Sequence, residues 1–270
     1  LKQHNIEAID LIVCNLYPFE EKPGIENIDI GGPTLIRAAA KNYATVAVLT
    51  NPRQYGEAMS AIETENGFTL EAREKLAIAA FARIAQYDDA IQQWFAAKDN
   101  ETFPENVALR YQKKSKLRYG ENPHQKAAFY VESPTIPDSL AGAEILHGKE
   151  LSFNNILDLD SALNLVREFD QPAVSVIKHN NPCGAAFGEN LPDVFEAAYN
   201  GDPLSAFGGI LAFNREVGIE TANRIASPNR FLECIIAPSY SDDALKILRG
   251  WKKNLRLLSC GEIQKIDSVF

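Results

Sequence analysis

Cysteine is scarce in this chain. Four cysteines occur among 270 residues, at positions 14, 183, 234 and 260, and no two of them form a Cys-x-x-Cys pair. A disulfide framework or a zinc knuckle needs closely spaced cysteines. We therefore expect free thiols in a reducing compartment, with the cytoplasm as the default location.

Three further features are missing, and each excludes a class of protein. No apolar run approaches the roughly 20 residues that span a bilayer, and no charged-then-apolar leader is present. The net charge is −9, whereas a nucleic-acid surface needs a basic footprint. No Gly-x-Gly-x-x-Gly opens a helix after a strand, which argues against a dinucleotide-dependent oxidoreductase. We expect neither a membrane nor a nucleic-acid partner, and an anionic substrate would need a local group of cations.

The composition is that of a globular protein, with 46% hydrophobic and 23% charged residues. A polar stretch over 98–104 interrupts the helical pattern, so we place a domain boundary near residue 110 and expect domains at 1–110 and 111–270. Leu1 is not an initiator Met and leads directly into a strand-like segment. We expect the chain to be part of a longer protein.

The first domain reads as a strand–helix–strand unit. Apolar runs over 8–19 and 45–50 predict buried strands, and residues 29–42 predict an Ala-rich helix that starts at two glycines and a proline. This order favours a parallel βαβ unit. Free N–H groups at such a helix start form an anion site, although a solvated face explains Arg37 and Lys41 equally well. Thr69 is expected to cap a long helix over 70–95.

The stretch over 173–184 is the most informative one. An apolar run ends in Lys178 and His179, which offer a charge stabiliser beside a base whose ordinary pKa is near neutral. Ligands in open α/β sheets bind at the carboxyl ends of strands. The backbone must turn near His179 for both groups to reach one substrate, and the sequence Asn-Asn-Pro-Cys-Gly supplies turn residues. An ordinary strand-to-loop transition explains the pattern as well.

Other segments of the second domain carry candidate binding groups. Arg118 lies in a polar loop and offers a planar fork that suits phosphate, although it also reads as a surface arginine. Gly208 and Gly209 allow a ligand close to the backbone, or form a plain turn. Helices are expected over 158–169 and 192–199, and a strand over 230–238 has Glu233 near its start.

Five motifs occur in order along the chain, and together they resemble the bifunctional purine biosynthesis family of the bacterial type, which joins AICAR transformylase to IMP cyclohydrolase. The motifs are Asn15-Leu16-Tyr17-Pro18-Phe19, Asp29-Ile30-Gly31-Gly32-Pro33-Thr34, Arg118-Tyr119-Gly120-Glu121-Asn122-Pro123-His124-Gln125, Lys178-His179-Asn180-Asn181-Pro182-Cys183-Gly184 and Ser205-Ala206-Phe207-Gly208-Gly209. The resemblance covers essentially the whole chain, which corresponds to the middle portion of the longer family protein.

The resemblance implies an α/β protein with two folds. Residues 1–110 are similar to the C-terminal part of the cyclohydrolase domain, a methylglyoxal-synthase-like α/β fold. Residues 111–270 are similar to the first repeat of the transformylase domain, a cytidine-deaminase-like α/β fold. We expect no zinc, because the zinc deaminases need His-x-Glu and Pro-Cys-x-x-Cys, whereas Pro182-Cys183 is followed by Gly-Ala-Ala.

For the transformylase, the resemblance implies formyl transfer from 10-formyltetrahydrofolate to AICAR, which gives FAICAR. His179 would be the general base on the amine, and Lys178 would stabilise developing charge. The substrate-binding positions would be Arg118, Tyr119, Gly208 and Glu233. No metal is required by this chemistry.

For the cyclohydrolase, the resemblance implies dehydrative ring closure of FAICAR to IMP, with Lys41 as the catalytic lysine. Cys14, Asn15, Asp29 and Ile30 would contact the nucleotide. The family also implies a homodimer. Parts of both sites would lie outside this segment, so we expect the segment alone to have little transformylase activity. A non-catalytic nucleotide-binding or scaffold fragment stays open as the alternative.

Overall fold

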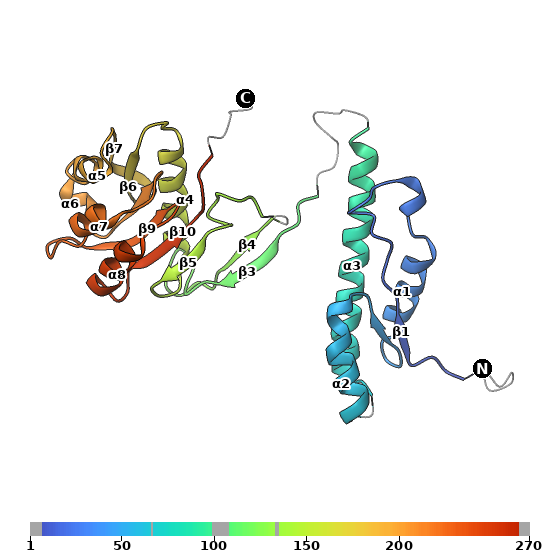
Figure 1. Ribbon diagram of the computed structural model, residues 1–270. Coiled ribbons are helices and arrows are strands. Elements are labelled where there is room, and N and C mark those ends of the chain that lie inside the picture. Colours follow the sequence, from blue (N-terminus) through green and yellow to red (C-terminus); the bar gives the residue numbers. More distant parts are fainter. Residues whose placement is uncertain (1–6, 66, 99–107, 133–134, 265–270) are drawn as a thin grey trace. The chain divides into compact units, whose positions relative to one another are not determined.

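The computed structural model describes residues 7–65, 67–98, 108–132 and 135–264. The chain divides into two compact units, Leu1–Ala108 and Leu109–Phe270. Figure 1 labels most of the helices and strands of both units, which are described in turn. No helix in the described part of the chain is both long and apolar enough to cross a membrane.

The first unit contains the expected parallel βαβ arrangement. Strand β1 (Leu11–Val13) pairs in parallel with β2 (Ala47–Leu49), and α1 (Gly31–Lys41) connects them. β1 is much shorter than the strand predicted over 8–19, and Ile9 and Val13 are exposed, so the prediction of a long buried strand was wrong. Within the described residues β1 pairs only with the three-residue β2, which limits the length of the ladder.

Helices provide most of the first unit's core. Helix α3 (Leu70–Ala96) has the predicted cap, because the Thr69 side chain accepts a hydrogen bond from the Ala72 N–H. The short 3-10 helices η2 (Ile25–Asn27) and η3 (Pro52–Gln54) and helix α2 (Tyr55–Glu65) were not predicted. Ile36 of α1 and Ile84 of α3 are buried in one apolar cluster. This cluster joins α1 and α3 to the two strands.

A six-stranded mixed sheet forms the centre of the second unit, in the order β5-β10-β9-β8-β6-β7. Its strands are β5 (Glu144–His147), β6 (Ala173–Lys178), β7 (Asn181–Phe187), β8 (Gly209–Phe213), β9 (Leu232–Ala237) and β10 (Arg256–Ser259). Strands β8, β9 and β10 are parallel to one another. β6 runs antiparallel to both β7 and β8, and β5 runs antiparallel to β10.

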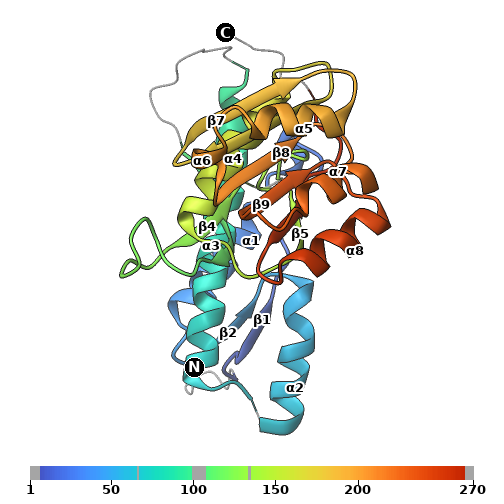
Figure 2. The same cartoon turned by 90° about the vertical axis from the view of Figure 1, so that its left-hand side faces the viewer.

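Helices cover both faces of this sheet (Figure 2). Val174 and Val176 of β6 face the cluster formed with α5 (Leu191–Tyr199), α7 (Ile219–Ile225) and α8 (Asp242–Trp251). Ala173 and Ile177 face the other cluster, which contains α4 (Phe153–Arg167). This alternation is expected for a strand that is buried on both faces. The one-turn helix α6 (Pro203–Ala206) precedes β8.

A two-stranded ribbon precedes the sheet in the chain. β3 (Gln112–Lys116) pairs antiparallel with β4 (Ala128–Val131). The polar loop between them docks onto the residues that start α4, because the Arg118 N–H donates to Leu151 O and the Phe153 N–H donates to Tyr119 O. These two bonds fix Arg118 and Tyr119 beside the sheet.

The structure corrects two expectations about the second unit. Helix α4 begins at Phe153 rather than Asp158, because Ser152 and Asn155 form a capping box. The residues Asn181-Pro182-Cys183-Gly184 belong to edge strand β7 rather than to a turn. Pro182 is compatible with that strand because an edge strand tolerates a missing N–H donor.

Candidate functional site

The candidate transformylase residues meet at one edge of the six-stranded sheet. Lys178 ends β6, Gly208 precedes β8, and Glu233 is the second residue of β9. Because β6 is antiparallel to β8, this edge combines the carboxyl end of β6 with the amino ends of β8, β9 and β10. Lys178 stands at the carboxyl end of its strand, as the sequence predicted, whereas the neighbouring strands contribute their amino ends. We call this side of the sheet the Lys178 edge.

Lys178 is held against the segment that leads into β8. Its ammonium donates to Phe207 O at 2.7 Å, and the Gly208 N–H donates to Phe231 O at 2.7 Å. Gly208 has φ 80°, a left-handed conformation that glycine adopts without a Cβ penalty. The rings of Phe207 and Phe231 lie 5.3 Å apart. These contacts link the end of β6 to the start of β9.

His179 lies in the turn that was predicted at this position. His179 and Asn180 both have positive φ, 53° and 62°, and together they connect β6 to β7. Asp158 of α4 accepts hydrogen bonds from both backbone N–H groups, at 3.3 Å from His179 and 2.7 Å from Asn180. The imidazole is exposed. The turn thus places the Lys178 and His179 side chains at the same edge.

Glu233 is held by two neighbours. Its Oε2 accepts from Asn155 Nδ2 at 3.0 Å and lies 3.5 Å from Arg256 Nη1. Asn155 also completes the capping box of α4, so one amide both starts the helix and orients the carboxylate. Arg256 is buried at the start of β10, and its Nε donates to Glu150 O at 3.2 Å. These hydrogen bonds therefore fix the carboxylate of Glu233 at the Lys178 edge of the sheet.

A cavity of about 320 Å³ lies beside these residues. Its wall contains five cationic side chains and a single carboxylate, in a chain whose net charge is −9. The lining residues are Arg118, Tyr119, Lys149, Phe231, Leu232, Glu233, Lys252, Lys253, Asn254, Leu255 and Arg256. Such a concentration of guanidinium and ammonium groups suits a phosphate or another oxyanion. We call this hollow the cationic cavity.

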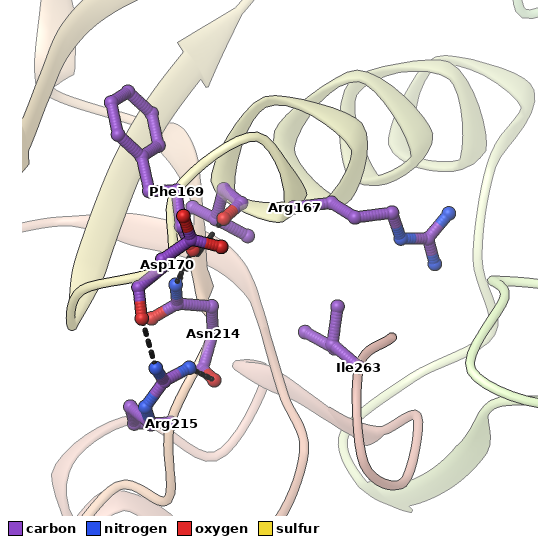
Figure 3. A pocket seen from close by; sticks show the side chains of 7 residues that line it. Arg167, Phe169, Asp170, Asn214, Arg215 and Ile263 are labelled. Carbon is purple, nitrogen blue, oxygen red and sulfur yellow. Dashed lines mark hydrogen bonds between the residues drawn. The ribbon is translucent and has the colours of Figure 1, made fainter. Parts of the chain in front are cut away.

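A second, smaller hollow of about 130 Å³ lies at the opposite edge of the sheet, where β6 begins and β8 ends (Figure 3). Asn214 binds four backbone groups there. It accepts from Ala173 N and donates to the carbonyl oxygens of Val166, Phe169 and Gln171. Arg215 donates to two backbone carbonyl oxygens. These polar groups hold the surrounding loops together through hydrogen bonds to their backbone.

In the first unit, Asp29 occupies the start of α1. Its Oδ1 accepts from the Gly32 N–H at 2.7 Å, and its own N–H donates to the Tyr87 hydroxyl at 2.8 Å. Tyr87 is fully buried and donates to Asn27 O at 2.9 Å. The expectation of a free anion site at this helix start was wrong for Gly32, because the chain's own carboxylate binds that N–H group.

Cys14 and Asn15 follow β1 at the same end of the unit as Asp29. The Asn15 amide donates to the Tyr55 hydroxyl at 2.6 Å. Partial burial raises the pKa of the Cys14 thiol, and the charge of Asp29 raises that pKa further. Ile30 is highly exposed.

Lys41 is the last residue of α1, and a rise of 1.5 Å per residue places it roughly 15 Å along the helix axis from Gly31. The structure therefore gathers four of these five candidates, with Lys41 at the far end of the helix.

Sequence reasoning missed much of the cationic cavity. Lys149, Lys252, Lys253 and Arg256 were not predicted, and neither was the supporting role of Asn155. A signal was present, because Arg256 lies within the apolar run of residues 255–258, and the two lysines stand three and four residues before it in the chain. A cation at the start of a buried strand is unusual unless it is paired. The connection to Arg118 could not be read, because it depends on strand order.

Comparison with known proteins identifies the family. The model of the AICARFT/IMPCHase bienzyme family matches residues 39–269. The chain belongs to this family. The bifunctional purine biosynthesis protein PurH of Listeria monocytogenes is 48% identical over 265 residues, which cover 95% of this chain and 52% of the relative. PurH of Thermoanaerobacter sp. is 47% identical over 271 residues, which cover 97% and 53%.

The chain spans about half the length of the curated PurH relatives that it matches. Among solved structures, the crystal structure of ForH aligns with 37% of this chain and 57% of its own, at 29% identity. Its TM-score of 0.33 is too low to define the fold. The architecture is mixed α/β, and among the described residues no group of three or more His, Cys, Asp or Glu side chains is placed to hold a metal ion.

Proposed function

We propose that the second unit carries the nucleotide-binding half of an AICAR formyltransferase, and that the whole protein converts AICAR to FAICAR and FAICAR to IMP. The observation that carries the proposal is the cationic cavity in a chain of this family. Phe231 lines this cavity, and its ring lies 5.3 Å from that of Phe207, whose carbonyl oxygen binds the Lys178 ammonium. AICAR bears a phosphate and a ribose, and the PurH relatives are named as purine biosynthesis proteins.

The phosphate of AICAR would lie among Arg118, Lys149 and the cations around β10. Arg118 stacks near Tyr119, with its guanidinium carbon 5.2 Å from the ring centroid, which leaves the planar fork suited to a bidentate oxyanion contact. Glu233 would accept from ribose hydroxyl groups. The Gly208 N–H already binds Phe231, so a backbone contact to the nucleotide would use the Gly208 carbonyl oxygen.

His179 would take a proton from the 5-amino group of AICAR as its nitrogen attacks the formyl carbon of 10-formyltetrahydrofolate. Lys178 would stabilise the negative charge that develops on the formyl oxygen. Collapse of the tetrahedral intermediate breaks the bond between N10 and the formyl carbon. The proton that His179 took from the amine passes to N10, and tetrahydrofolate leaves. An ammonium has three N–H donors, so the bond to Phe207 O fixes the position of Lys178 while leaving its charge directed to the substrate.

An apolar surface next to Lys178 suits the flat ring system of the folate. Leu204 is 89% exposed and Phe207 is 54% exposed, and both line one hollow with Tyr199 and Pro203. Large exposed apolar side chains that gather beside a polar site commonly contact a ligand. No metal takes part in the proposed chemistry.

The first unit would contribute to the cyclohydrolase, with Cys14, Asn15, Asp29 and Ile30 near the nucleotide and Lys41 in proton transfer. This assignment rests on family membership.

From family membership we also propose a methylglyoxal-synthase-like fold for the whole first domain, a cytidine-deaminase-like fold for the second, and a homodimer for the intact protein. Sedimentation of the full-length protein as a monomer would contradict the dimer.

The formyltransferase proposal can be tested in the full-length protein with Lys178→Ala and His179→Ala. Loss of a general base should reduce kcat for FAICAR formation by about 10²–10⁴-fold, while the Kd for AICAR changes by less than about threefold, because the phosphate contacts remain. Lys246→Ala, on the exposed face of α8, is the control and should leave both values unchanged. Unaltered turnover in both site variants would refute the proposal. Loss of AICAR binding by the same factor as turnover would support a binding role instead.

A further inference from the structure

We propose that Asp158 is a positioning residue for formyl transfer, and that it acts by holding the His179–Asn180 turn in its left-handed conformation. The inference rests on the proposed role of His179 as the general base. Asp158 itself is placed to contact backbone rather than substrate.

The first step of the argument is the conformation of the turn. His179 and Asn180 have φ 53° and 62°, and apart from Asp138 they are the only described non-glycine residues with positive φ. Two consecutive left-handed residues of this kind form the tight turn that joins two antiparallel strands. Glycine usually occupies such positions because a Cβ makes them unfavourable. The conformation therefore needs external support, and strain of this kind is typical of functional sites.

The second step is the source of that support. The two carboxylate oxygens of Asp158 each accept one N–H group of the turn, from His179 to Oδ2 at 3.3 Å and from Asn180 to Oδ1 at 2.7 Å. Charge-assisted hydrogen bonds of this kind are stronger than neutral ones. Ser161, one turn further along α4, donates to the Asn180 side-chain oxygen. The turn is therefore bound to α4 through both its backbone and its side chain.

The third step is that α4 also positions the nucleotide side of the site. Asn155, Asp158 and Ser161 are spaced three residues apart and therefore lie along one face of the helix. Asn155 holds Glu233, and Asp158 holds His179, at 3.0 Å and 3.3 Å respectively. One rigid helix face thus sets the position of the proposed base relative to the proposed ribose ligand. The capping box at Ser152 and Asn155 fixes where that face begins.

The test uses kcat and KM for formyl transfer in the full-length protein. Asp158→Ala should reduce kcat by about 10–100-fold, because a misplacement of about 1 Å has effects of this size. KM for AICAR should change by less than about threefold, since the cationic cavity is untouched. Asp158→Asn should be intermediate, because a carboxamide has one acceptor oxygen where the carboxylate has two. Asp160→Ala is the matched control on the same helix. Asp160 is exposed and accepts a hydrogen bond from the Asn164 side chain, so this variant should behave as wild type.

Two further readouts separate positioning from a general loss of structure. Ring closure of added FAICAR should be unchanged in Asp158→Ala, whereas unfolding of the chain would lower both activities. Amide hydrogen exchange at His179 and Asn180 should increase in this variant. The double variant Asp158→Ala/Asn180→Gly should have a higher kcat than Asp158→Ala, because glycine adopts positive φ without support. Asn180→Gly alone is the reference that shows the effect of the glycine change itself.

The proposal is overturned if Asp158→Ala matches Asp160→Ala in kcat, or if formyl transfer and ring closure fall together. It is also overturned if the Asn180→Gly addition recovers nothing. Failure of the proposed function is distinguishable from these results, because wild-type protein would then form no FAICAR at all. In that case the exchange rates of His179 and Asn180 still decide whether Asp158 holds the turn.

Discussion

Arg256 offers a quantitative test of how the Lys178 edge is held together. Its side chain is 4% exposed, and it faces the Glu233 carboxylate, which is 43% exposed, at 3.5 Å. In Arg256→Met the apolar stem is preserved and the charge is removed. Breaking a fully buried ion pair costs about 3–5 kcal/mol because the remaining charge has no partner. Glu233 is nearly half exposed and can rehydrate, so we expect a smaller cost of about 1–2 kcal/mol.

Amide hydrogen exchange in the full-length protein measures this cost locally, which avoids assuming a single unfolding transition. Peptides that cover β9 and β10 should exchange about 5–30 times faster in Arg256→Met. Arg249→Met is the control, because Arg249 is exposed on α8 and donates to Leu146 O at 3.0 Å. It should change the rates by less than about twofold.

Two results would refute this reasoning. Unchanged exchange in Arg256→Met would mean that the contact with Glu233 contributes nothing to the start of β10. An increase far above 30-fold would mean that Glu233 cannot rehydrate and that the pair behaves as fully buried. Either result would change the assignment of Glu233 as a group available to a ribose.

Three further predictions concern other parts of the chain. Asn214→Ala leaves the buried Ala173 N–H without its acceptor and should destabilise the second unit by about 2–4 kcal/mol. Faster amide hydrogen exchange in β6 and β8 measures this loss. The control variant Arg215→Ala should cost less than about 1 kcal/mol. Tyr87→Phe removes the hydroxyl that binds Asn27 and Asp29, so the Michaelis constant for FAICAR should rise several-fold while formyl transfer is unchanged; equal KM values would contradict the role of Tyr87. Burial raises the pKa of the Cys234 thiol to about 12 and that of Cys260 to about 11, so both thiols should resist iodoacetamide at pH 8. Alkylation of Cys234 or Cys260 faster than that of Cys14 or Cys183 would contradict the packing.

The pH dependence of thiol labelling follows from the same shifts. Burial raises the pKa of Cys14 and Cys183, with smaller contributions from nearby carboxylates, so less thiolate is present at a given pH than in a free cysteine. Their alkylation rates should therefore reach half of their maximum at a higher pH than that of glutathione. Labelling followed by mass spectrometry measures this directly, and a midpoint below the free-thiol value would contradict the burial.

Local patterns predicted several elements of the fold from sequence. The apolar run before Lys178 predicted β6, the helical spacing after Thr69 predicted α3, and the need for a turn at His179 was confirmed. Each of these features depends on residues that are neighbours in the chain. The resemblance that the five motifs carry is confirmed by the family match.

The features that could not be predicted from the sequence depend on pairing between strands that are far apart in the chain. Polar and short strands such as β3 and β5 carry no apolar run, and their strand character comes from their partners β4 and β10. The antiparallel placement of β6 beside β8 brings the amino ends of β8, β9 and β10 to the Lys178 edge, and no local pattern encodes it. Arg256 and Lys149 approach Arg118 only because β10 and β5 are adjacent. The cationic cavity is therefore a product of strand order.

A crystal structure of the full-length protein with bound AICAR tests the central claim most directly. We predict that the phosphate lies in the cationic cavity within hydrogen-bond distance of Arg118, and that the 5-amino group of the same nucleotide faces the His179 imidazole. A nucleotide bound at the opposite edge of the sheet, or one whose phosphate and amine do not reach Arg118 and His179 together, would contradict the account.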